Sequence, residues 1–307
     1  AMKVLVATEK PFAAVAVDSI RKVIEDAGYE LELLEKYPSR EELLAAVADA
    51  DALIVRSDKA DAEVIAAAKK LKVIVRAGAG YDNIDLAAAT AAGICVENTP
   101  GQNSNAVAEL VFGMAVMAAR NMYDGTSGSE LKEKKIGIHA FGQVGRNVAR
   151  IAKGFGMEVC ALDPFCPDES MKAAGVNPVH SVNELYSENS IVSIHIPATA
   201  ETKGSIGYDL ITSLPKGGIL INTARKEVID EEGLKKALED RQDIRYLSDI
   251  KPDNAAELSS LFGSRVFFTP KKMGAQTSEA NINAGIAAAR QVVAFLKDGV
   301  DKYRVNK

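Results

Sequence analysis

The sequence has few cysteines and no long apolar run, and these two shortages exclude whole classes of protein. The three cysteines, Cys95, Cys160 and Cys166, are irregularly spaced, which fits neither a disulfide framework nor a zinc site. We therefore expect free thiols, a cytoplasmic protein and no metal site. No apolar run reaches the roughly 18 residues that a membrane span needs. The N-terminus also lacks a basic segment followed by an apolar core, so no membrane partner is expected.

An excess of basic charge is also missing. The chain has 37 Lys and Arg against 42 Asp and Glu, a net charge of −5, and it contains no dense basic block. A nucleic-acid partner is therefore not expected, and the ligand should be small. With 47% hydrophobic and 26% charged residues, the composition is that of a globular protein, and 307 residues are enough for two domains with ordinary cores.

Strand and helix patterns alternate from the start of the chain. Short apolar runs that read as strands, each followed by helical spacing, occupy residues 3–7, 30–34, 52–55, 72–75 and 94–96. This alternation predicts a parallel sheet with helices on both faces. Arg56 and Arg76 follow two of these strands, at the carboxyl ends where open α/β sheets bind ligands. Both arginines suit anion recognition, although any single loop arginine is more often solvated or ion-paired.

The segment from Ser104 to Arg120 predicts a helix that is apolar nearly all round. Its large side chains are Val107, Leu110, Val111, Phe112, Met114, Val116 and Met117. They are more than one face of a monomer can cover, so we expect a homodimer whose interface is the helix at 104–120. A loop rich in Gly and Ser follows at 123–134.

Residues 135–164 read as strand, glycine turn, helix, strand and a terminal acid. Gly142 and Gly145 open the helix, where free N–H groups can hold a pyrophosphate. Gly142 lets the backbone approach that group, and Gly145 lets helix and strand pack closely. Asp163 can accept hydrogen bonds from a ribose and repel the extra phosphate of NADP, which predicts NAD. Because the first glycine of G-x-G-x-x-G is Ala140 here, the motif alone also fits an ordinary strand-to-helix turn.

The rest of the chain continues the alternation. Further strand patterns, at 191–196, 218–222, 245–247 and 266–268, complete a dinucleotide domain of six strands. A long alanine-rich helix over 277–297 is expected to return to the first domain. We therefore predict an α/β protein with a discontinuous substrate-binding domain, residues 2–99 and 281–307, into which a Rossmann NAD-binding domain of residues 100–280 is inserted.

Several segments together carry a resemblance to a known family. They are VRSDKAD (55–61), RAGAGYDNIDL (76–86), ENTPGQNSNAVAEL (97–110), the glycine turn with Asp163, IHIPATAETKG (194–204), INTARKEVIDEEGL (221–234) and TPKKMGAQT (269–277). In this order, over nearly the whole chain, they resemble the D-2-hydroxyacid dehydrogenases, and among these most of all the phosphoglycerate dehydrogenases. The match is far more specific than the glycine turn alone.

The resemblance implies a nicotinamide domain inserted into a flavodoxin-like domain, a dimer, and hydride transfer between NAD and a 2-hydroxy or 2-keto acid. The implied reaction is oxidation of 3-phospho-D-glycerate to 3-phosphohydroxypyruvate, the first step of serine biosynthesis. Two alternatives stay open: another 2-hydroxyacid dehydrogenase, acting on glyoxylate or hydroxypyruvate, and an NAD-responsive binding protein. The chain ends directly after the last helix, so a serine-sensing domain is not expected.

The resemblance also implies the role of individual residues. Arg225 matches the arginine that binds the substrate carboxylate and polarises the keto group, and a forked, permanently charged guanidinium suits both tasks. The matches to substrate-binding positions are Arg56, Ser57, Arg76 and Gly78. The matches to cofactor-binding positions are Gly142, Gln143, Val144 and Gly145 at the pyrophosphate, Asp163 at the ribose, His195 and Pro197 on the adenosine side, Thr223 and Ala224 at the nicotinamide ribose, and Asp249 at the carboxamide.

Two residues of the family's catalytic pair are replaced. Members have a histidine after Thr-Pro and a glutamate that follows the aspartate matched by Asp249; this chain has Lys271 and Asn254 there. A lysine base needs its pKa lowered from about 10.4 toward neutrality. A glutamate partner would raise that pKa, so the two losses are consistent with each other.

We therefore predict Lys271 as the catalytic acid/base. The neighbouring Lys272 and Arg225 would help to lower its pKa, as would burial. Lys272 itself and Asp253 remain alternative proton carriers, and a surface lysine without a catalytic role is the simplest competing interpretation.

Overall fold

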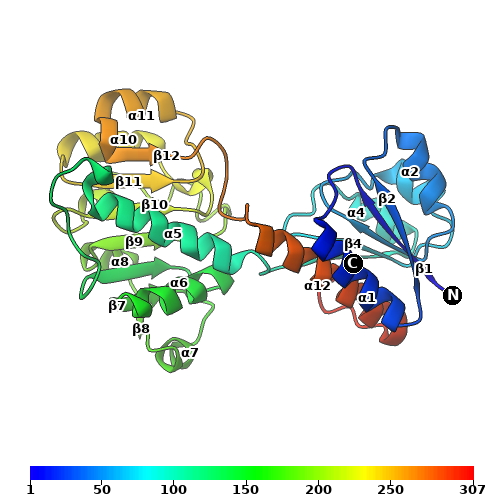
Figure 1. Cartoon of the computed structure of the whole chain (residues 1–307). Coiled ribbons are helices and arrows are strands. Elements are labelled where there is room, and N and C mark those ends of the chain that lie inside the picture. The colour runs from blue at the N-terminus through cyan, green and yellow to red at the C-terminus, as the bar shows by residue number, and fades with distance from the viewer. The chain divides into compact units, whose positions relative to one another are not determined.

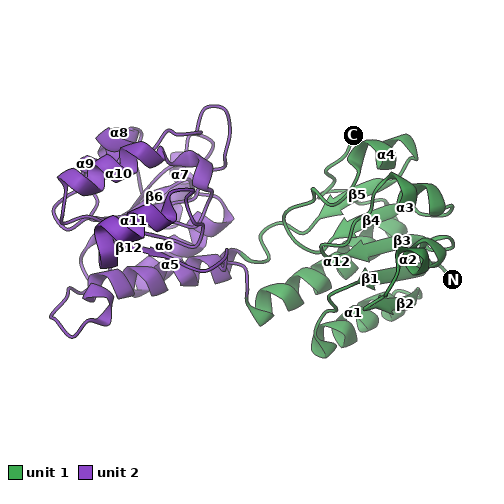
Figure 2. Cartoon of the chain, turned by 90° about the horizontal axis from the view of Figure 1, so that it is seen from above, with its two compact units in different colours: residues 1–103, 277–307 green, residues 104–276 purple.

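The computed structural model describes residues 1–307, which divide into two compact units (Figure 2). Unit 1 comprises residues 1–103 and 277–307, and unit 2 comprises residues 104–276. The unit boundaries therefore follow residues 103 and 276, where the sequence placed them after 99 and 280. Each unit contains its own parallel sheet.

Unit 1 contains a five-stranded sheet in the order β2-β1-β3-β4-β5, with every pair parallel. The strands are β1 (Lys3–Thr8), β2 (Glu30–Glu35), β3 (Ala52–Val55), β4 (Val73–Arg76) and β5 (Cys95–Asn98). The inner strands read as unbroken apolar runs because both faces of a parallel sheet are covered. This strand order is that of flavodoxin-like folds, as the family resemblance implied.

Helices cover both faces of the unit 1 sheet. On one face α1 (Ala14–Asp26) and α12 (Ser278–Asp298) lie side by side (Figure 1). On the other face lie α2 (Arg40–Val47), α3 (Ala62–Ala67) and α4 (Leu86–Ala91). Ala288 and Val292 of α12 share a buried cluster with Val4 and Ile20, so the C-terminal helix does return to the first unit.

Unit 2 contains a seven-stranded parallel sheet in the order β12-β11-β10-β9-β6-β7-β8. The strands are β6 (Lys135–His139), β7 (Glu158–Leu162), β8 (Asn177–Pro178), β9 (Ile191–Ile194), β10 (Ile219–Asn222), β11 (Arg245–Ser248) and β12 (Val266–Phe268). Counted from β6, this is the doubly wound Rossmann order with one strand added. The expected count of six strands was wrong. The additional strand is β8, which has only two residues, one of them a proline, and is too short to show a strand pattern in the sequence.

Helices also cover both faces of the unit 2 sheet. One face carries α5 (Ser104–Ala119), α6 (Gln143–Gly154) and α7 (Asp168–Ala173), and the other α8 (Val182–Ser187), α9 (Tyr208–Thr212), α10 (Glu231–Asp240) and α11 (Ala255–Phe262). Alternate residues of β10 separate the two cores: Ile219 and Ile221 face the first set, and Leu220 the second. Short 3₁₀ turns occupy Asn121–Tyr123, Lys226–Val228 and Gly263–Arg265. None of the helices combines the length and apolar character that crossing a membrane requires.

Candidate active site

The strand register of unit 2 brings four of the predicted cofactor-binding residues into one row. The aligned last residues of six strands are His139, Leu162, Ile194, Asn222, Ser248 and Phe268. The residues that follow them along the carboxyl edge of the sheet are Ala140, Asp163, His195, Thr223, Asp249 and Thr269. Four of the predicted cofactor residues thus lie in this row. The topological switch point between β6 and β9, where such sheets bind ligands, falls inside it.

The turn after β6 has the geometry of a phosphate-binding turn. Ala140 has φ of +86°, a left-handed conformation that favours glycine. A Cβ added at Gly142, the residue before α6, would meet no atom within 4 Å. A Cβ added at Gly145 would collide with the carbonyl of Ala140. Gly145 therefore allows close packing of helix on strand, and Gly142 leaves room for a ligand. Because no side chain caps α6, its first N–H groups are free to bind an anion.

Asp163 fixes this turn in place. One of its carboxylate oxygens accepts the backbone N–H of Phe141 at 2.8 Å, and the other accepts that of Phe165 at 2.9 Å. The carboxylate thereby ties the loop after β6 to the loop after β7. Each oxygen keeps a second lone pair with which it can accept a ribose hydroxyl.

Two buried side-chain oxygens in the row have no partner in the protein. Asp249 is fully buried; its Oδ2 accepts the backbone N–H groups of Met273 and Gly274 at 3.2 and 2.7 Å, while Oδ1 has no hydrogen bond. The hydroxyl of Thr223, which is 5% exposed, also has none. Buried polar atoms are costly to leave unpaired. The two atoms fit a ligand with an amide and hydroxyl groups, such as the nicotinamide riboside half of NAD.

The backbone around Thr223 is held by Asn222, a residue that the sequence did not single out. The side chain of Asn222 accepts the N–H of Ala224 at 2.9 Å and donates to the carbonyl of Arg225 at 3.0 Å. The N–H of Ala224 is therefore already used within the protein. The two hydrogen bonds of Asn222 fix the turn that carries Arg225. The Nη1 of Arg225 itself donates to the carbonyl of Ala224 at 2.7 Å.

The histidine of the row is neutral. His195 lies 2.7 Å from the hydroxyl of Ser193 through Nε2, and burial lowers its pKa well below the usual value. At neutral pH the ring therefore carries no charge that would attract the phosphates of a cofactor. Pro197 is exposed two residues further on, where its carbonyl accepts the Thr202 hydroxyl.

The two lysines after Thr269-Pro270 have different surroundings. The backbone of this segment is fixed at both ends, since the Thr269 hydroxyl donates to the carbonyl of Lys271 and Asp249 accepts the N–H groups that follow Lys272. The pKa of Lys272 is lowered, first by burial of its ammonium group and then by the charge of Arg225, although part of its side chain is exposed.

The third candidate for the proton, Asp253, is already engaged. Its carboxylate forms an ion pair with Lys226 at 2.7 Å, on the exposed surface. Asn254 stands where the family has its glutamate, and its amide donates weakly to the carbonyl of Glu231 at 3.5 Å.

In unit 1 the two predicted substrate-binding arginines lie close enough for their charges to interact. Arg56 and Arg76 follow β3 and end β4, and neither has a carboxylate within ion-pair distance. The pKa of Arg76 is lowered, first by burial and then by the charge of Arg56. The Nε of Arg76 is buried without a partner. Two cations that repel each other, one with an unused donor, are a physical argument for a bound anion.

Gly78 makes room for one of these arginines. A Cβ at this position would collide with the guanidinium of Arg76, and its φ of +151° is also in the region that favours glycine. The N–H of Gly78 donates to the hydroxyl of Thr99 at 2.7 Å. Ser57 lines a hollow of about 270 Å³ together with Tyr37 and Asp58, and neither Arg56 nor Arg76 lines this hollow.

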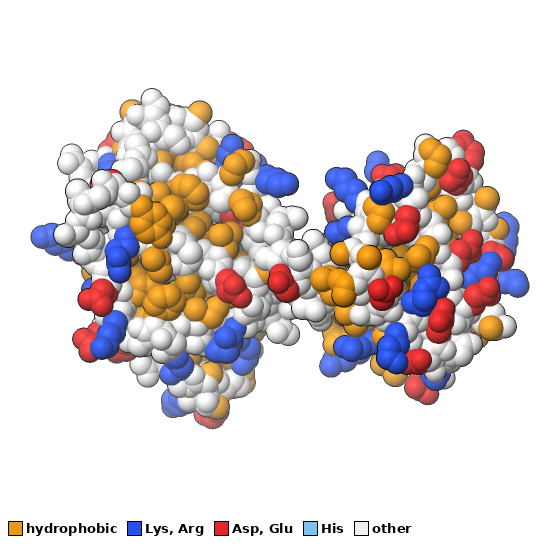
Figure 3. Space-filling view, viewed as in Figure 1, with side chains coloured by type: hydrophobic (Ala, Val, Ile, Leu, Met, Phe, Trp, Pro, Cys, Tyr) orange, Lys and Arg blue, Asp and Glu red, His pale blue; other side chains and the backbone are white.

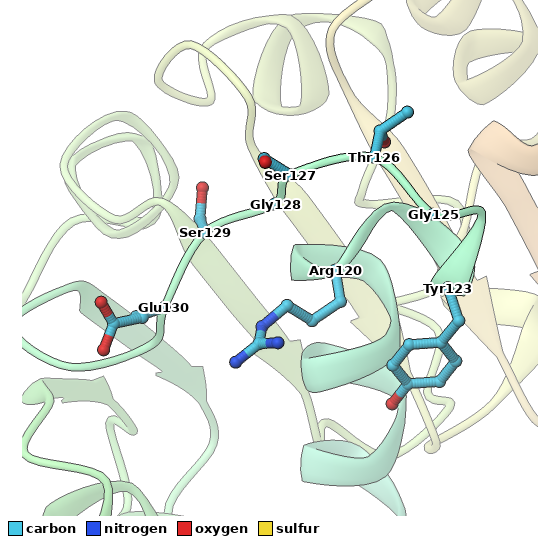
Figure 4. A pocket seen from close by; sticks show the side chains of 8 residues that line it. All are labelled: Arg120, Tyr123, Gly125, Thr126, Ser127, Gly128, Ser129 and Glu130. Carbon is cyan, nitrogen blue, oxygen red and sulfur yellow. The ribbon is translucent and has the colours of Figure 1, made fainter.

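A separate cavity of about 480 Å³ lies under the loop that follows α5 (Figure 4). Arg120 extends into the space that the loop encloses. Ser129 of the same loop also lines a neighbouring hollow with Ile191 and Ile219, the first residues of β9 and β10. The cavity is therefore at the amino edge of the sheet, away from the row of site residues.

Comparison with known proteins now assigns the chain to a family. The family model described as D-isomer specific 2-hydroxyacid dehydrogenase, catalytic domain, matches residues 5–306. The chain belongs to this family. A solved structure of NAD+-bound 3-phosphoglycerate dehydrogenase from Entamoeba histolytica shares 48% identity with this 2-hydroxyacid dehydrogenase chain at a TM-score of 0.81, over 100% of this chain and 99% of the other.

Two further family members are similar in sequence. D-3-phosphoglycerate dehydrogenase of Methanocaldococcus jannaschii is 37% identical over 93% of this chain, and hydroxypyruvate reductase of Thermotoga maritima is 34% identical over 86%. The match covers 57% of the first protein's length and 90% of the second's. The chain thus spans little more than half the length of the Methanocaldococcus jannaschii protein, but nearly the whole of the Entamoeba histolytica chain.

Proposed function

We propose that this chain is an NAD-dependent dehydrogenase that oxidises 3-phospho-D-glycerate to 3-phosphohydroxypyruvate, the first step of serine biosynthesis. The assignment of this substrate rests on one observation: the arginines Arg56 and Arg76 have no carboxylate partner. A phosphate needs such a cationic site in addition to Arg225, which we assign to the substrate carboxylate. Ser57 and Gly78 complete the substrate-binding set. The two phosphoglycerate dehydrogenases named above support the same reaction.

The row of unit 2 would hold the cofactor. Gly142, Gln143, Val144 and Gly145 are assigned to the pyrophosphate, His195 and Pro197 to the adenosine side, Thr223 and Ala224 to the nicotinamide ribose, and Asp249 to the carboxamide. Asp163 would accept the ribose hydroxyls and exclude a 2′-phosphate, which favours NAD over NADP. When bound, the nicotinamide accepts the hydride from the carbon that carries the substrate hydroxyl.

The chain itself supplies the proton chemistry. Arg225 orients the carboxylate and polarises the C2 oxygen with its forked donors. A lysine of the pair at 271 and 272 takes the hydroxyl proton during oxidation and returns it during reduction. The sequence favours Lys271 because it follows Thr-Pro. The lowered pKa of Lys272 and the fixed backbone on either side of it favour Lys272.

We also propose that the protein acts as a homodimer in the cytoplasm. An apolar area lies over α5 and α6 on the face of unit 2 shown in Figure 3. Leu110, Val116 and Met117 of α5 are only half-buried, and Phe155, which stacks on Phe112 at 5.2 Å, is 38% exposed. A second copy of the chain would cover these side chains.

A second candidate function is reduction of hydroxypyruvate or glyoxylate, which the match to the hydroxypyruvate reductase favours. The deciding experiment is steady-state turnover of NADH with phosphohydroxypyruvate, hydroxypyruvate and glyoxylate, and of NAD or NADP with 3-phosphoglycerate. We expect the phosphorylated substrate to have the highest kcat/KM, and NAD to be strongly preferred. A higher kcat/KM for hydroxypyruvate would support the second candidate. Binding of NADH without turnover of any of these acids would indicate a binding protein.

A further inference from the structure

A buried carboxylate lies two residues after Arg56 in the chain. Asp58 follows Arg56 and Ser57 in the loop after β3 and is only 6% exposed. Its Oδ2 accepts two hydrogen bonds, from the backbone N–H of Glu9 at 2.8 Å and from the hydroxyl of Tyr37. No Lys, Arg or His forms an ion pair with Asp58. A buried carboxylate without a cation is costly, so these two donors must stabilise it.

The hydrogen bonds of Asp58 connect it to the guanidinium of Arg56. By accepting the N–H of Glu9, the carboxylate fixes the loop after β1. The next two carbonyls of that loop, those of Lys10 and Pro11, accept Nη1 of Arg56 at 2.8 and 3.2 Å. These contacts form a closed ring. Asp58 binds the loop after β1, that loop binds the side chain of Arg56, and Arg56 is two residues from Asp58 in the chain. A shift of the carboxylate would therefore move the arginine.

Two other contacts make the arrangement rigid. The guanidinium of Arg56 lies over the ring of Phe12 at 5.1 Å. The amide of Asn83 donates to the carbonyls of Arg56 and Asp58 at 3.0 and 2.7 Å. The charge of Asp58 also acts on Arg76, whose cationic form it stabilises against the cost of burial.

We propose that Asp58 and Tyr37 are positioning residues that aim Arg56 at the phosphate of the substrate, an inference that rests on the proposed function. With Nη1 held by two carbonyls, the edge formed by Nε and Nη2 stays available. That edge is a planar pair of donors that matches two oxygens of an anion. Neither residue needs to touch the substrate to act in this way.

The test compares three variants of the full chain. Asp58→Asn keeps an acceptor for Glu9 and Tyr37 but removes the charge, and Tyr37→Phe removes one donor. The matched control is Asp51→Asn, because Asp51 accepts the N–H of Lys3 at 2.8 Å and so joins the same two strands at their opposite ends. The readouts are KM and kcat with 3-phosphoglycerate, NADH affinity, and binding of inorganic phosphate by calorimetry.

Since hydrogen bonds to a charged group are about twice as strong as neutral ones, we expect Asp58→Asn to raise KM and the phosphate Kd by about tenfold. Tyr37→Phe should raise both by about threefold, and kcat, NADH affinity and the control should stay within about twofold of wild type. Unchanged KM and phosphate affinity in both variants would overturn the proposal, as would equal losses of NADH affinity and kcat. If Asp58→Asn does not fold, the KM and phosphate Kd of Tyr37→Phe alone test the proposal.

The phosphate titration separates this inference from the proposed function. If the wild type binds phosphate but does not turn over 3-phosphoglycerate, the proposed substrate is wrong, and weaker phosphate binding by the variants still supports the positioning role. A wild type that binds no phosphate at millimolar concentrations has no anion site at Arg56, and the inference fails.

Discussion

Lys271 and Lys272 are neighbours in the sequence, and both are candidates for the catalytic proton carrier. Burial and the charge of Arg225 lower the pKa of Lys272, while Asp249 and Glu227 oppose that shift. A proton carrier must change its charge within the working pH range, and a lysine does so only when its surroundings disfavour the ammonium form. The pKa of Lys272, one residue beyond the position that the sequence pattern selected, is shifted in this direction.

We therefore expect Lys272→Ala to lower kcat by about 100-fold with NADH affinity nearly unchanged, the usual cost of losing a proton-transfer group. Lys271→Ala is the matched control and should keep kcat within about tenfold of wild type. Steady-state kinetics and an NADH titration measure both. If Lys271→Ala instead causes the larger loss of kcat, Lys271 is the proton carrier. If both variants lose only a little kcat, the proton carrier is Asp253 or water.

The pH dependence of the reaction should follow the same lysine. Oxidation needs the neutral amine, so its kcat/KM should rise as pH increases through the pKa; reduction needs the ammonium, so its kcat/KM should fall. Because the pKa of Lys272 is lowered from its ordinary 10.5, both transitions should lie below that value in the wild type. Lys272→Ala should remove them, while Lys271→Ala should retain them.

At the scale of elements, the turn between β6 and α6 keeps its shape without the glycine that this motif usually has. Ala140 adopts φ of +86°, which costs a residue with a Cβ about 1–2 kcal/mol. Asp163 offsets this strain by binding the N–H of Phe141, the next residue. The turn is thus maintained by a tertiary hydrogen bond.

Ala140→Gly should relieve this strain. The gain is reduced by the larger entropy that glycine has in the unfolded chain, about 0.4–1 kcal/mol, so unit 2 should become more stable by about 0.5–1 kcal/mol. Urea unfolding followed by far-UV circular dichroism measures the change. Ala256→Gly is the control, because Ala256 is an exposed residue within α11, where glycine should destabilise by about 1 kcal/mol. A loss of stability in both variants would show that Ala140 is unstrained.

Sequence patterns predicted elements in proportion to their length and regularity. The five strands of unit 1 and the helices α5 and α12 were predicted within a residue or two, because short apolar runs mark buried strands and these helices extend over several turns. α7, α8, α9 and α11 were missed; the first three have five or six residues, too few to show one. Most of the candidate site residues come from sequence motifs. Asn222, Tyr37 and the role of Asp58 do not, because their hydrogen bonds join segments that only the fold brings together.

At the scale of the whole molecule, α5 explains why a single copy of the chain leaves apolar surface uncovered. Val107, Val111 and Met114 are buried within unit 2, whereas Leu110, Val116 and Met117 are only half-buried. Fully burying a side chain of this size is worth about 1.5–3 kcal/mol. Three such side chains beside Phe155 therefore favour association with a second copy.

Met117→Glu should consequently convert the proposed dimer to a monomer, because association would bury a carboxylate without a partner, at a cost of several kcal/mol. Light scattering at micromolar concentration would show the halved mass, and circular dichroism would show that the fold is kept. Leu261→Glu is the matched control: Leu261 lies on α11 and is 54% exposed, outside the apolar area of α5, so this variant should remain a dimer. If the wild type is itself a monomer at this concentration, or if Met117→Glu stays dimeric, then α5 is not the interface.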